Sequence, residues 1–444
     1  MAEKNNKKTV WAWCMFDWAN QAYNMVITST IFPAYFVGIT SDHNPGQKVS
    51  FFGHMYNNTV LSTYVLGISY LVVVVLIPIL TSIADYKGNK KLYLQMFTWL
   101  GSLACAGLFF LYEDSSFHLQ HFEWGMICFG LASVGYCGGF VFYNSYLPQI
   151  ATTDQQDAVS AKGFIYGFVG SIVVQLICLV PIMEHAFFHI TEDFAARISF
   201  LIVGIWWIGF SFIAFYYLPK GKPNEGSHQY NVLTGGFKEL AKVFGKVRQM
   251  PLMKRFLSAF FFYSVGVQTI MLVAANFAAK ELKMPDDDLI GIILIIQVVA
   301  VIGAVLASKS SAKYGNVKTL VGLVTIWTGI CCCVYFVTSE AQFYVAAIVV
   351  GLVMGGVQSL SRSTYSKYLP ENITDTASYF SFYDVTEKLS IVVGLLCFAT
   401  VENITNEMRD SALALDCFFA VGLFLLISLL VYENKGKGKL APLI

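Results

Sequence analysis

Phe16-Asp17-Trp18-Ala19-Asn20-Gln21-Ala22-Tyr23-Asn24 is the stretch that decides the fold of this chain. It lies inside an apolar run from about residue 10 to residue 39. Four polar residues recur at i, i+3, i+4 and i+7, which places them on one face of a helix: Asp17, Asn20, Gln21 and Asn24. Such a stripe is costly in lipid unless it faces protein or water. It predicts a membrane bundle with a polar interior; the alternative is that the stripe only hydrogen-bonds to neighbouring helices.

Composition points to the same class of protein. The chain has 444 residues, of which 56% are hydrophobic and 13% are charged, whereas soluble domains carry about 25% charged residues. The formal net charge of +1 gives no reason to expect a nucleic-acid partner. The ten cysteines form no CxxC pair, and no phosphate-binding GxxxxGK[ST] string is present. We therefore expect no cofactor, no structural metal and no enzyme activity.

Apolar runs long enough to span a bilayer occur twelve times along the chain. A span needs about 20 mostly apolar residues. The predicted spans are 10–39, 59–84, 92–112, 122–147, 159–183, 195–218, 252–279, 288–312, 317–338, 341–367, 375–400 and 409–432.

The distribution of lysine and arginine predicts the orientation of these spans. With both termini in the cytoplasm, 22 of the 29 basic residues fall on the inner side and 5 on the outer side. In a bacterium, the chain would then lie in the inner (plasma) membrane with both termini cytoplasmic.

One long connection divides the chain into residues 1–218, a linker 219–251 and residues 252–444. In the linker, four apolar residues recur at helical spacing with basic residues between them: Phe237, Leu240, Phe244 and Val247. This pattern predicts a short basic amphipathic helix. It could lie on cytoplasmic headgroups, bind a calmodulin-like partner, or pack between the two halves, and we favour packing.

The two halves of the sequence echo each other. Tyr146-Leu147-Pro148 ends span four and Tyr368-Leu369-Pro370 ends span ten. The turns after spans two and eight are also alike, with Ala84-Asp85-Tyr86-Lys87-Gly88-Asn89 matching Ala312-Lys313-Tyr314-Gly315-Asn316. These echoes predict an all-α membrane protein of twelve transmembrane helices in two pseudo-symmetric six-helix halves.

Several motifs resemble those of a known transporter family. The turn Asp85-Tyr86-Lys87-Gly88-Asn89-Lys90-Lys91 looks like the D-R-x-G-R-K signature of the major facilitator superfamily, with Tyr86 in place of the usual Arg. Within it, the chain resembles the vacuolar-effluxer-like family, named for autophagy-associated fungal amino-acid exporters. The matching stretches are Phe16–Tyr23, Tyr143–Ala151, Ser160–Phe164, Gly355–Ser363, and Ser381–Val385 with Lys388. The resemblance covers the whole chain and implies the major facilitator fold and export of a solute, such as an amino acid.

Two positions depart from the family pattern. Val265 stands where the family often has an acidic residue in span seven, and Lys313 stands where the second-half turn usually has Asp. A mechanism that needs those two carboxylates is therefore in doubt for this chain.

Five charged residues are predicted inside spans: Asp17, Arg362, Asp384, Glu387 and Lys388. Intramembrane charges mark candidate functional sites. Asp384 lies near the predicted midplane of span eleven, and we assign Asp384, Glu387 and Lys388 to proton coupling. Asp384 and Lys388 could instead neutralise each other at i, i+4. Arg362 could bind a carboxylate or snorkel to the interface.

The remaining candidates are polar residues at helical spacing or in turns. The predicted solute-cavity residues are Asp17, Asn20, Gln21, Asn24, Asn144, Gln268, Asn276, Gln358 and Arg362. Asp85 and Lys90 in the first-half turn are predicted gating residues, for which a solvated loop aspartate is the alternative. His118-x-x-His121 and His185-x-x-x-His189 have ligand-like spacing, although loop histidines without a metal are commoner.

Together these observations predict a monomeric secondary active transporter. We expect it to move a small polar solute outward by alternating access, coupled to protons. Two alternatives remain open: an uncoupled facilitator, and a membrane scaffold that moves no solute.

Overall fold

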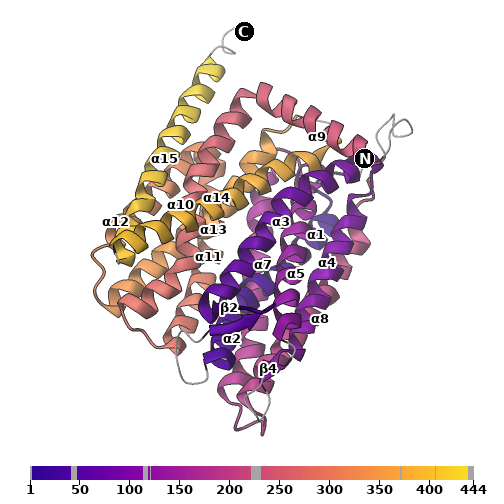
Figure 1. The fold of residues 1–444 in the computed structure, drawn as a ribbon. Helices are drawn as coiled ribbons and strands as arrows, with labels where there is room; N and C mark the ends of the chain where they lie inside the picture. Colours follow the sequence, from indigo (N-terminus) through magenta and orange to yellow (C-terminus); the bar gives the residue numbers. More distant parts are fainter. Residues whose placement is uncertain are drawn as a thin grey trace. The chain divides into compact units, whose positions relative to one another are not determined.

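The computed structural model describes residues 3–41, 48–113, 119–120, 122–221, 232–370, 373–405 and 407–438 (Figure 1). Helices dominate, as expected of a chain in lipid, because a helix satisfies its backbone hydrogen bonds internally. The elements of the first half of the sequence are α1 (Lys7–Ala22), η1 (Tyr23–Ile31), α2 (Phe32–Ser41), β1 (Lys48–Phe51), β2 (His54–Asn57), α3 (Asn58–Lys87), α4 (Lys90–Gly107), η2 (Leu108–Phe110), β3 (Tyr112–Glu113), β4 (Leu119–Gln120), α5 (Phe122–Asn144), α6 (Leu147–Ile150), α7 (Gln156–Met183) and α8 (Glu192–Tyr217). Those of the second half are α9 (Val232–Gln249), α10 (Pro251–Glu281), α11 (Asp286–Tyr314), α12 (Asn316–Val334), α13 (Glu340–Lys367), α14 (Thr376–Thr405) and α15 (Met408–Gly438).

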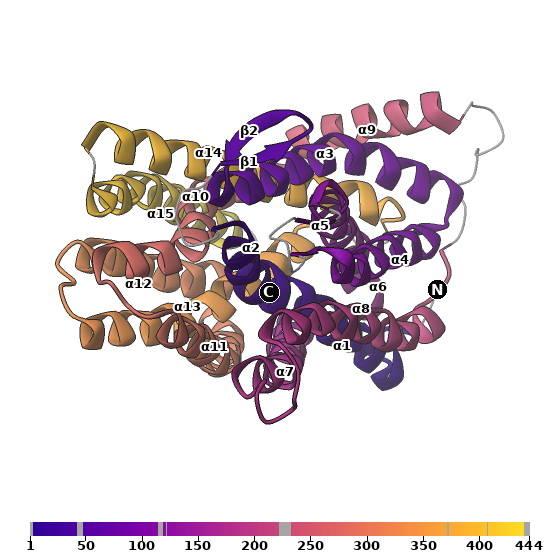
Figure 2. The same ribbon diagram turned by 60° about the horizontal axis from the view of Figure 1, so that its bottom comes forward.

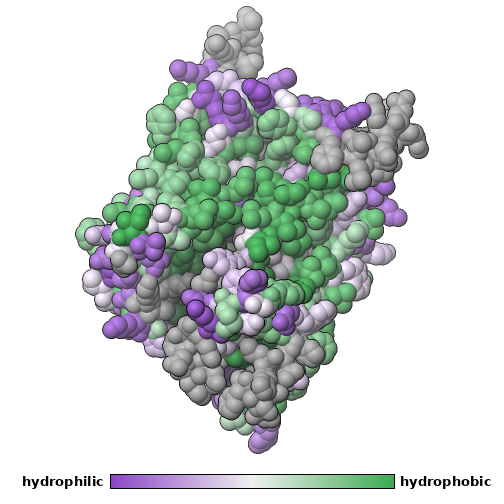
Figure 3. Space-filling model, viewed as in Figure 1, coloured by the Kyte–Doolittle hydropathy of each residue, from purple (hydrophilic) through white to green (hydrophobic). Residues whose placement is uncertain are grey.

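Twelve helical segments in the described part of the chain are long and apolar enough to cross a membrane. They coincide with the twelve predicted spans, with ends shifted by a few residues, so that prediction is confirmed. On the face that Figure 3 shows, hydrophobic residues form a broad central band and hydrophilic residues gather toward the two ends. The chain is therefore an integral, multi-pass membrane protein.

Local sequence signals set the helix ends. The Asn6 side chain caps α1 by accepting hydrogen bonds from the backbone N–H groups of Lys8 and Thr9. Gly88 ends α3 at φ 66° and Gly315 separates α11 from α12 at φ 87°, and glycine adopts such backbone conformations readily. Two short antiparallel hairpins, β1–β2 and β3–β4, were not predicted from the sequence.

The first span is not a uniform α-helix. The chain passes from α1 into a π-helical segment, η1, and then into α2. Within η1, the hydroxyls of Ser29 and Thr30 donate to the carbonyls of Asn24 and Met25 at 2.9 and 2.8 Å. The stripe was predicted from α-helical spacing, in which Asn24 at i+7 shares a face with Asp17. Because a π-turn is wider than an α-turn and η1 begins at Tyr23, that spacing no longer holds at Asn24.

The chain forms two compact units. One contains Asn6–Tyr143 and Tyr166–Ser227, and the other contains Met1–Asn5, Asn144–Ile165 and His228–Ile444. The segment Asn144–Ile165 comes from the first half of the sequence but groups with the second half. The division at 219–251 remains a prediction.

Each unit has its own apolar core. In the first unit, aromatic side chains dominate: the Phe32 and Phe129 rings stack at 3.9 Å between centroids, and the Tyr23 and Trp207 rings at 5.3 Å. In the second unit, α10 packs against α14 and α15, α11 against α13, and α12 against α13 and α15. Figure 2 shows these second-unit helices from one end.

Candidate functional site

The polar stripe of the first span is buried inside the first unit. Asp17 is fully buried and its Oδ2 accepts a hydrogen bond from the Tyr143 hydroxyl at 2.6 Å. Gln21 is also buried, and its Oε1 accepts from the Tyr136 hydroxyl at 2.6 Å. Two tyrosines of α5 therefore fix two polar groups of α1. The sequence analysis did not single out either tyrosine as a site residue.

Asn20 differs from its neighbours on the stripe. Its side chain is fully buried, and within the described residues neither its amide nitrogen nor its amide oxygen has a hydrogen-bond partner. An unsatisfied buried amide costs about 1–3 kcal/mol. Asn24, by contrast, is only half-buried. Asn20 thus offers an NH2 donor group and a carbonyl acceptor that water or a polar solute could satisfy.

The second unit contains a cluster of charged and polar side chains on α10 and α14. Lys388 Nζ lies 3.1 Å from Glu387 Oε2 and 3.9 Å from Asp384 Oδ1. Gln268 Nε2 donates to Glu387 Oε1 at 2.9 Å. Asp384 and Lys388 are buried. Two carboxylates thus surround a single ammonium inside a membrane span.

The oxygen atoms of the two carboxylates are not equally satisfied. Each oxygen of Glu387 has a donor. For Asp384, one oxygen lies 3.9 Å from Lys388 and the other is buried with no hydrogen-bond partner among the described residues. Asp384 is therefore the less stabilised anion of the two.

Gln358 and Asn276 are the other predicted cavity residues of the second half. The Gln358 amide donates to Met271 Sδ at 3.8 Å, a weak acceptor, and its Oε1 is buried with no partner in the described part of the chain. The side chain of Asn276 lies outside the described residues. Gln358 therefore keeps an acceptor available inside the bundle.

Arg362 does not snorkel, because only 1% of its surface is exposed. It donates to Ser160 Oγ at 3.0 Å, to the Ser160 carbonyl at 2.8 Å and to Asn144 Oδ1 at 3.1 Å. Its guanidinium also lies 4.2 Å from the centre of the Phe164 ring. The structure thus brings together the predicted residues Asn144 and Arg362, and it assigns Arg362 to joining α13 with the segment Asn144–Ile165.

A second polar cluster, centred on Asp157, was missed from the sequence. Asp157 accepts hydrogen bonds from Lys367 Nζ at 2.5 Å, Asn316 Nδ2 at 2.7 Å and Ser311 Oγ at 3.2 Å. Lys313 holds the position where the family pattern has Asp, yet a carboxylate from the start of α7 contacts the same α11–α12 turn. No sequence signal pointed to it, since an acidic residue in the first turn of a helix is ordinary.

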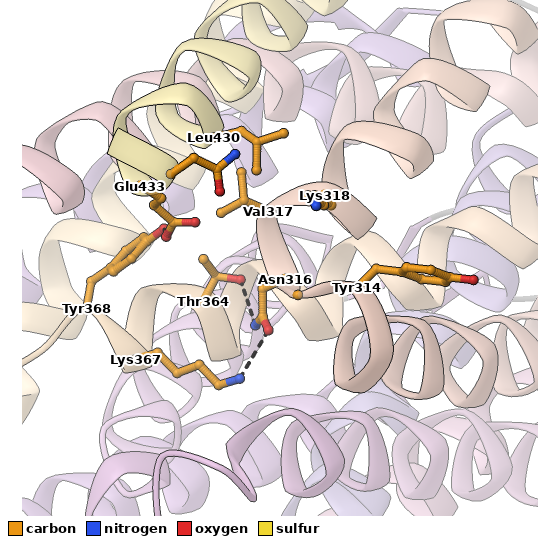
Figure 4. A pocket seen from close by; sticks show the side chains of 11 residues that line it. Tyr314, Asn316, Val317, Lys318, Thr364, Lys367, Tyr368, Leu430 and Glu433 are labelled. Carbon is orange, nitrogen blue, oxygen red and sulfur yellow. Dashed lines mark hydrogen bonds between the residues drawn. The ribbon is translucent and has the colours of Figure 1, made fainter. Parts of the chain in front are cut away.

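A cavity of about 310 Å³ opens beside this cluster, between the ends of α12, α13 and α15. Figure 4 shows Asn316 between Thr364 and Lys367, and Tyr368 reaching toward Glu433. The Tyr368 hydroxyl donates to Glu433 Oε1 at 2.5 Å. Burial, together with this carboxylate, raises the pKa of the Tyr368 hydroxyl, which keeps it protonated as a donor.

The predicted gating residues lie at the α3–α4 turn of the first unit. Asp85 and Lys90 are 5% and 3% exposed, so the alternative of a solvated loop aspartate is wrong. Lys91 donates to the Leu218 carbonyl at 2.8 Å and ties this turn to the end of α8. Gating itself remains a prediction.

One further charged residue lies inside a span. The sequence analysis overlooked Asp416, which lies within the span Met408–Lys435 and accepts a hydrogen bond from Cys332 Sγ at 3.0 Å.

Of the histidines with ligand-like spacing, His118 and His121 lie outside the described residues, while His185 Nδ1 is 3.1 Å from the Ile182 carbonyl. In the part of the chain that the structure describes, no three His, Cys, Asp or Glu side chains are grouped to hold a metal ion.

Comparison with known proteins identifies the family of this chain. The sequence matches the family described as "Vacuole effluxer Atg22 like" over residues 5–441. The chain belongs to this family. A relative from Bacillus subtilis, described as an uncharacterized MFS-type transporter, YxiO, is 27% identical over 94% of this chain and 93% of its own. Autophagy-related protein 22 of Yarrowia lipolytica is 23% identical over 87% of this chain and 78% of its own.

Solved structures give the fold of this family member. The proton:xylose symporter XylE superposes with a TM-score of 0.70 at 12% identity, covering 95% of each chain. The transporter FucP in its outward conformation gives 0.68 at 12% identity, covering 96% of this chain and 99% of its own. The fold is that of the major facilitator superfamily. Taken with the family match and the description of the relative, the protein is a transporter of that superfamily rather than an enzyme.

Proposed function

We propose that this transporter exports a small polar solute, an amino acid or a related metabolite, in exchange for protons and by alternating access. The observation that carries the proposal is the state of Asp384. It is a buried carboxylate in a membrane span, with one oxygen unpartnered among the described residues and the other 3.9 Å from Lys388.

The arrangement favours Asp384 over Glu387 as the proposed proton acceptor. Glu387 accepts hydrogen bonds from Gln268 and Lys388. Protonation of Glu387 would therefore disrupt a carboxylate whose hydrogen bonds are already satisfied. A proton on Asp384 removes no short hydrogen bond in the described structure, and it makes the three-residue cluster formally neutral. Burial of a net charge is costly, so a closed site favours the neutral cluster and a site open to water favours proton release.

The solute class follows from the other buried polar groups. Asn20 in the first unit and Gln358 in the second each hold amide atoms without partners in the described residues. Amides offer donors and acceptors suited to a neutral or zwitterionic polar molecule. The family description, vacuole effluxer, supports export, as does the relative known as an autophagy-related protein. The proton symporters among the proteins of similar fold support coupling to protons.

Orientation and assembly complete the proposal. The excess of basic residues on one side favours cytoplasmic termini, and in a bacterium the protein would lie in the plasma membrane. We expect it to act as a monomer.

The test is transport by purified protein in liposomes, with a panel of radiolabelled amino acids. Asp384→Asn should abolish accumulation driven by a pH gradient, while counterflow exchange at equal pH on both sides persists. Asp154→Asn, at an exposed position, is the matched control and should behave like the parent. If Asp384→Asn still concentrates solute, the assignment is wrong and Asp17→Asn is tested next. Transport that ignores collapse of the pH gradient would instead identify an uncoupled facilitator.

A further inference from the structure

The helix α9 belongs to the second unit and lies directly before α10 in the sequence. The predicted basic amphipathic helix is confirmed as a helix over Val232–Gln249. Within the second unit it packs against α10 and α14. Val243 and Val247, one turn apart, are buried, so one apolar side of α9 is covered by the protein itself.

Two contacts set the depth of α9 relative to the membrane. Lys246 Nζ lies 3.7 Å from Asp375 Oδ2, immediately before α14 begins. The Phe244 ring lies 6.0 Å from the ring of Phe382, six residues beyond Thr376. The 30 residues of α14 extend about 45 Å, whereas the hydrocarbon core is about 30 Å thick. About 7 Å of helix therefore overhangs at each end, and Phe382, about 9 Å along, lies at the edge of the hydrocarbon.

At this depth, α9 carries an exposed aromatic side chain, Phe244, together with exposed basic residues. Phe244 is 56% exposed although it is a large apolar side chain. The exposed basic residues on α9 and in the first turns of α10 are Lys238, Lys242, Arg248, Lys254 and Arg255. Arg255 lies 4.7 Å from the centre of the Tyr432 ring and donates to Ser428 at 2.9 Å. These five basic residues and Phe244 are called the basic collar below.

We propose that the basic collar binds the headgroups of anionic phospholipids in the leaflet that faces α9, with Phe244 inserted at the boundary between headgroups and acyl chains. An aromatic ring flanked by Lys and Arg is the combination that interfacial helices present to an anionic membrane. An acidic protein partner is the less suitable occupant. Such a partner would enclose the apolar side of α9, and Val243 and Val247 are already buried within the unit.

The contribution of each basic residue to the affinity for anionic lipid can be estimated as a fold-change. Each Lys or Arg close to an anionic surface favours binding by about fivefold. Removing three of the five charges should therefore lower the local affinity for anionic lipid by more than about tenfold, even if part of the effect is lost to screening. At about 1 M salt the screening length falls to about 3 Å, which should weaken the contact without altering the protein.

The experiment uses the full-length transporter in lipid nanodiscs. Phe244→p-benzoylphenylalanine is photolysed in phosphatidylethanolamine with and without phosphatidylglycerol, and lipid adducts are quantified by mass spectrometry. The same substitution at Phe424, 71% exposed on α15, reports contact with acyl chains. We expect adducts at position 244 that favour phosphatidylglycerol and decline at about 1 M salt, and adducts at position 424 that depend on neither.

Charge variants complete the test. In the Phe244 photoprobe background, K238Q/K242Q/R248Q should lower the phosphatidylglycerol adduct more than tenfold relative to the parent. The matched control K309Q/K313Q/K318Q changes three exposed lysines around the α11–α12 turn and should leave it unchanged. Equal labelling of both lipids, an unchanged adduct in the first variant, or crosslinking to a co-purified protein in place of lipid would each overturn the proposal. None of these outcomes depends on the transported solute.

Discussion

Asp157 offers the sharpest test of how the second unit is held together. It receives three hydrogen bonds, and its strongest partner is the ammonium of Lys367 at 2.5 Å. The Asp157 and Lys367 side chains are 9% and 22% exposed, so the pair is mostly but not fully withdrawn from water. Asp157→Asn keeps the shape, removes the charge, and turns an amide donor toward Lys367 or Asn316.

The cost can be estimated from this geometry. A hydrogen bond to a charged group contributes about 1.5–3 kcal/mol, and breaking a fully buried ion pair costs about 3–5 kcal/mol. Because Lys367 retains some contact with water, we expect Asp157→Asn to lower the free energy of unfolding by about 2–3 kcal/mol. The double variant Asp157→Asn/Lys367→Gln should be less destabilised, by at least about 1 kcal/mol, than the sum of the losses of the two single variants, and this difference is the coupling energy of the pair.

The assay is equilibrium unfolding of the detergent-solubilised protein, followed by intrinsic fluorescence. Asp154→Asn, three residues upstream and exposed, is the matched control and should shift the unfolding free energy by less than about 0.5 kcal/mol. A loss for Asp157→Asn no larger than that of Asp154→Asn would refute the reasoning. So would strictly additive effects of the Asp157 and Lys367 substitutions.

Three further predictions test other parts of the structure. Reporter fusions at both ends should place both termini in the cytoplasm; either terminus outside would contradict the charge argument. Cysteine at Asn20 or Asn24, in a background without native cysteines, should react with water-soluble thiol reagents in at least one transport state, and protection in every state would exclude an aqueous cavity there. A Cβ at Gly394 would lie 2.9 Å from the Val265 carbonyl and against Thr269. Gly394→Ala should therefore cost about 1–3 kcal/mol in the same unfolding assay. Nothing lies within 4 Å at Gly329, so Gly329→Ala is the control and should be close to neutral.

The sequence by itself determined the membrane class and the twelve spans. Both depend on local composition: an apolar run of about 20 residues can only be a spanning helix, whatever its neighbours are. The linker helix could be predicted from the sequence for the same reason, because amphipathic spacing is a property of neighbouring residues in the chain. The interior position of Asp17 and Gln21 followed from the cost of placing such groups in lipid.

Tertiary structure alone decided which polar groups meet. Arg362 and Asn144 were predicted separately, 218 positions apart, and nothing local showed that they form a hydrogen bond. Asp157 was not predicted as a site residue, because its hydrogen-bond partners are remote in sequence. The pairing of Gln268 with Glu387, which leaves Asp384 as the less satisfied carboxylate, depends on how α10 packs on α14. Hydrogen bonds act over about 3 Å, so only the packed chain reveals which donors reach which acceptors.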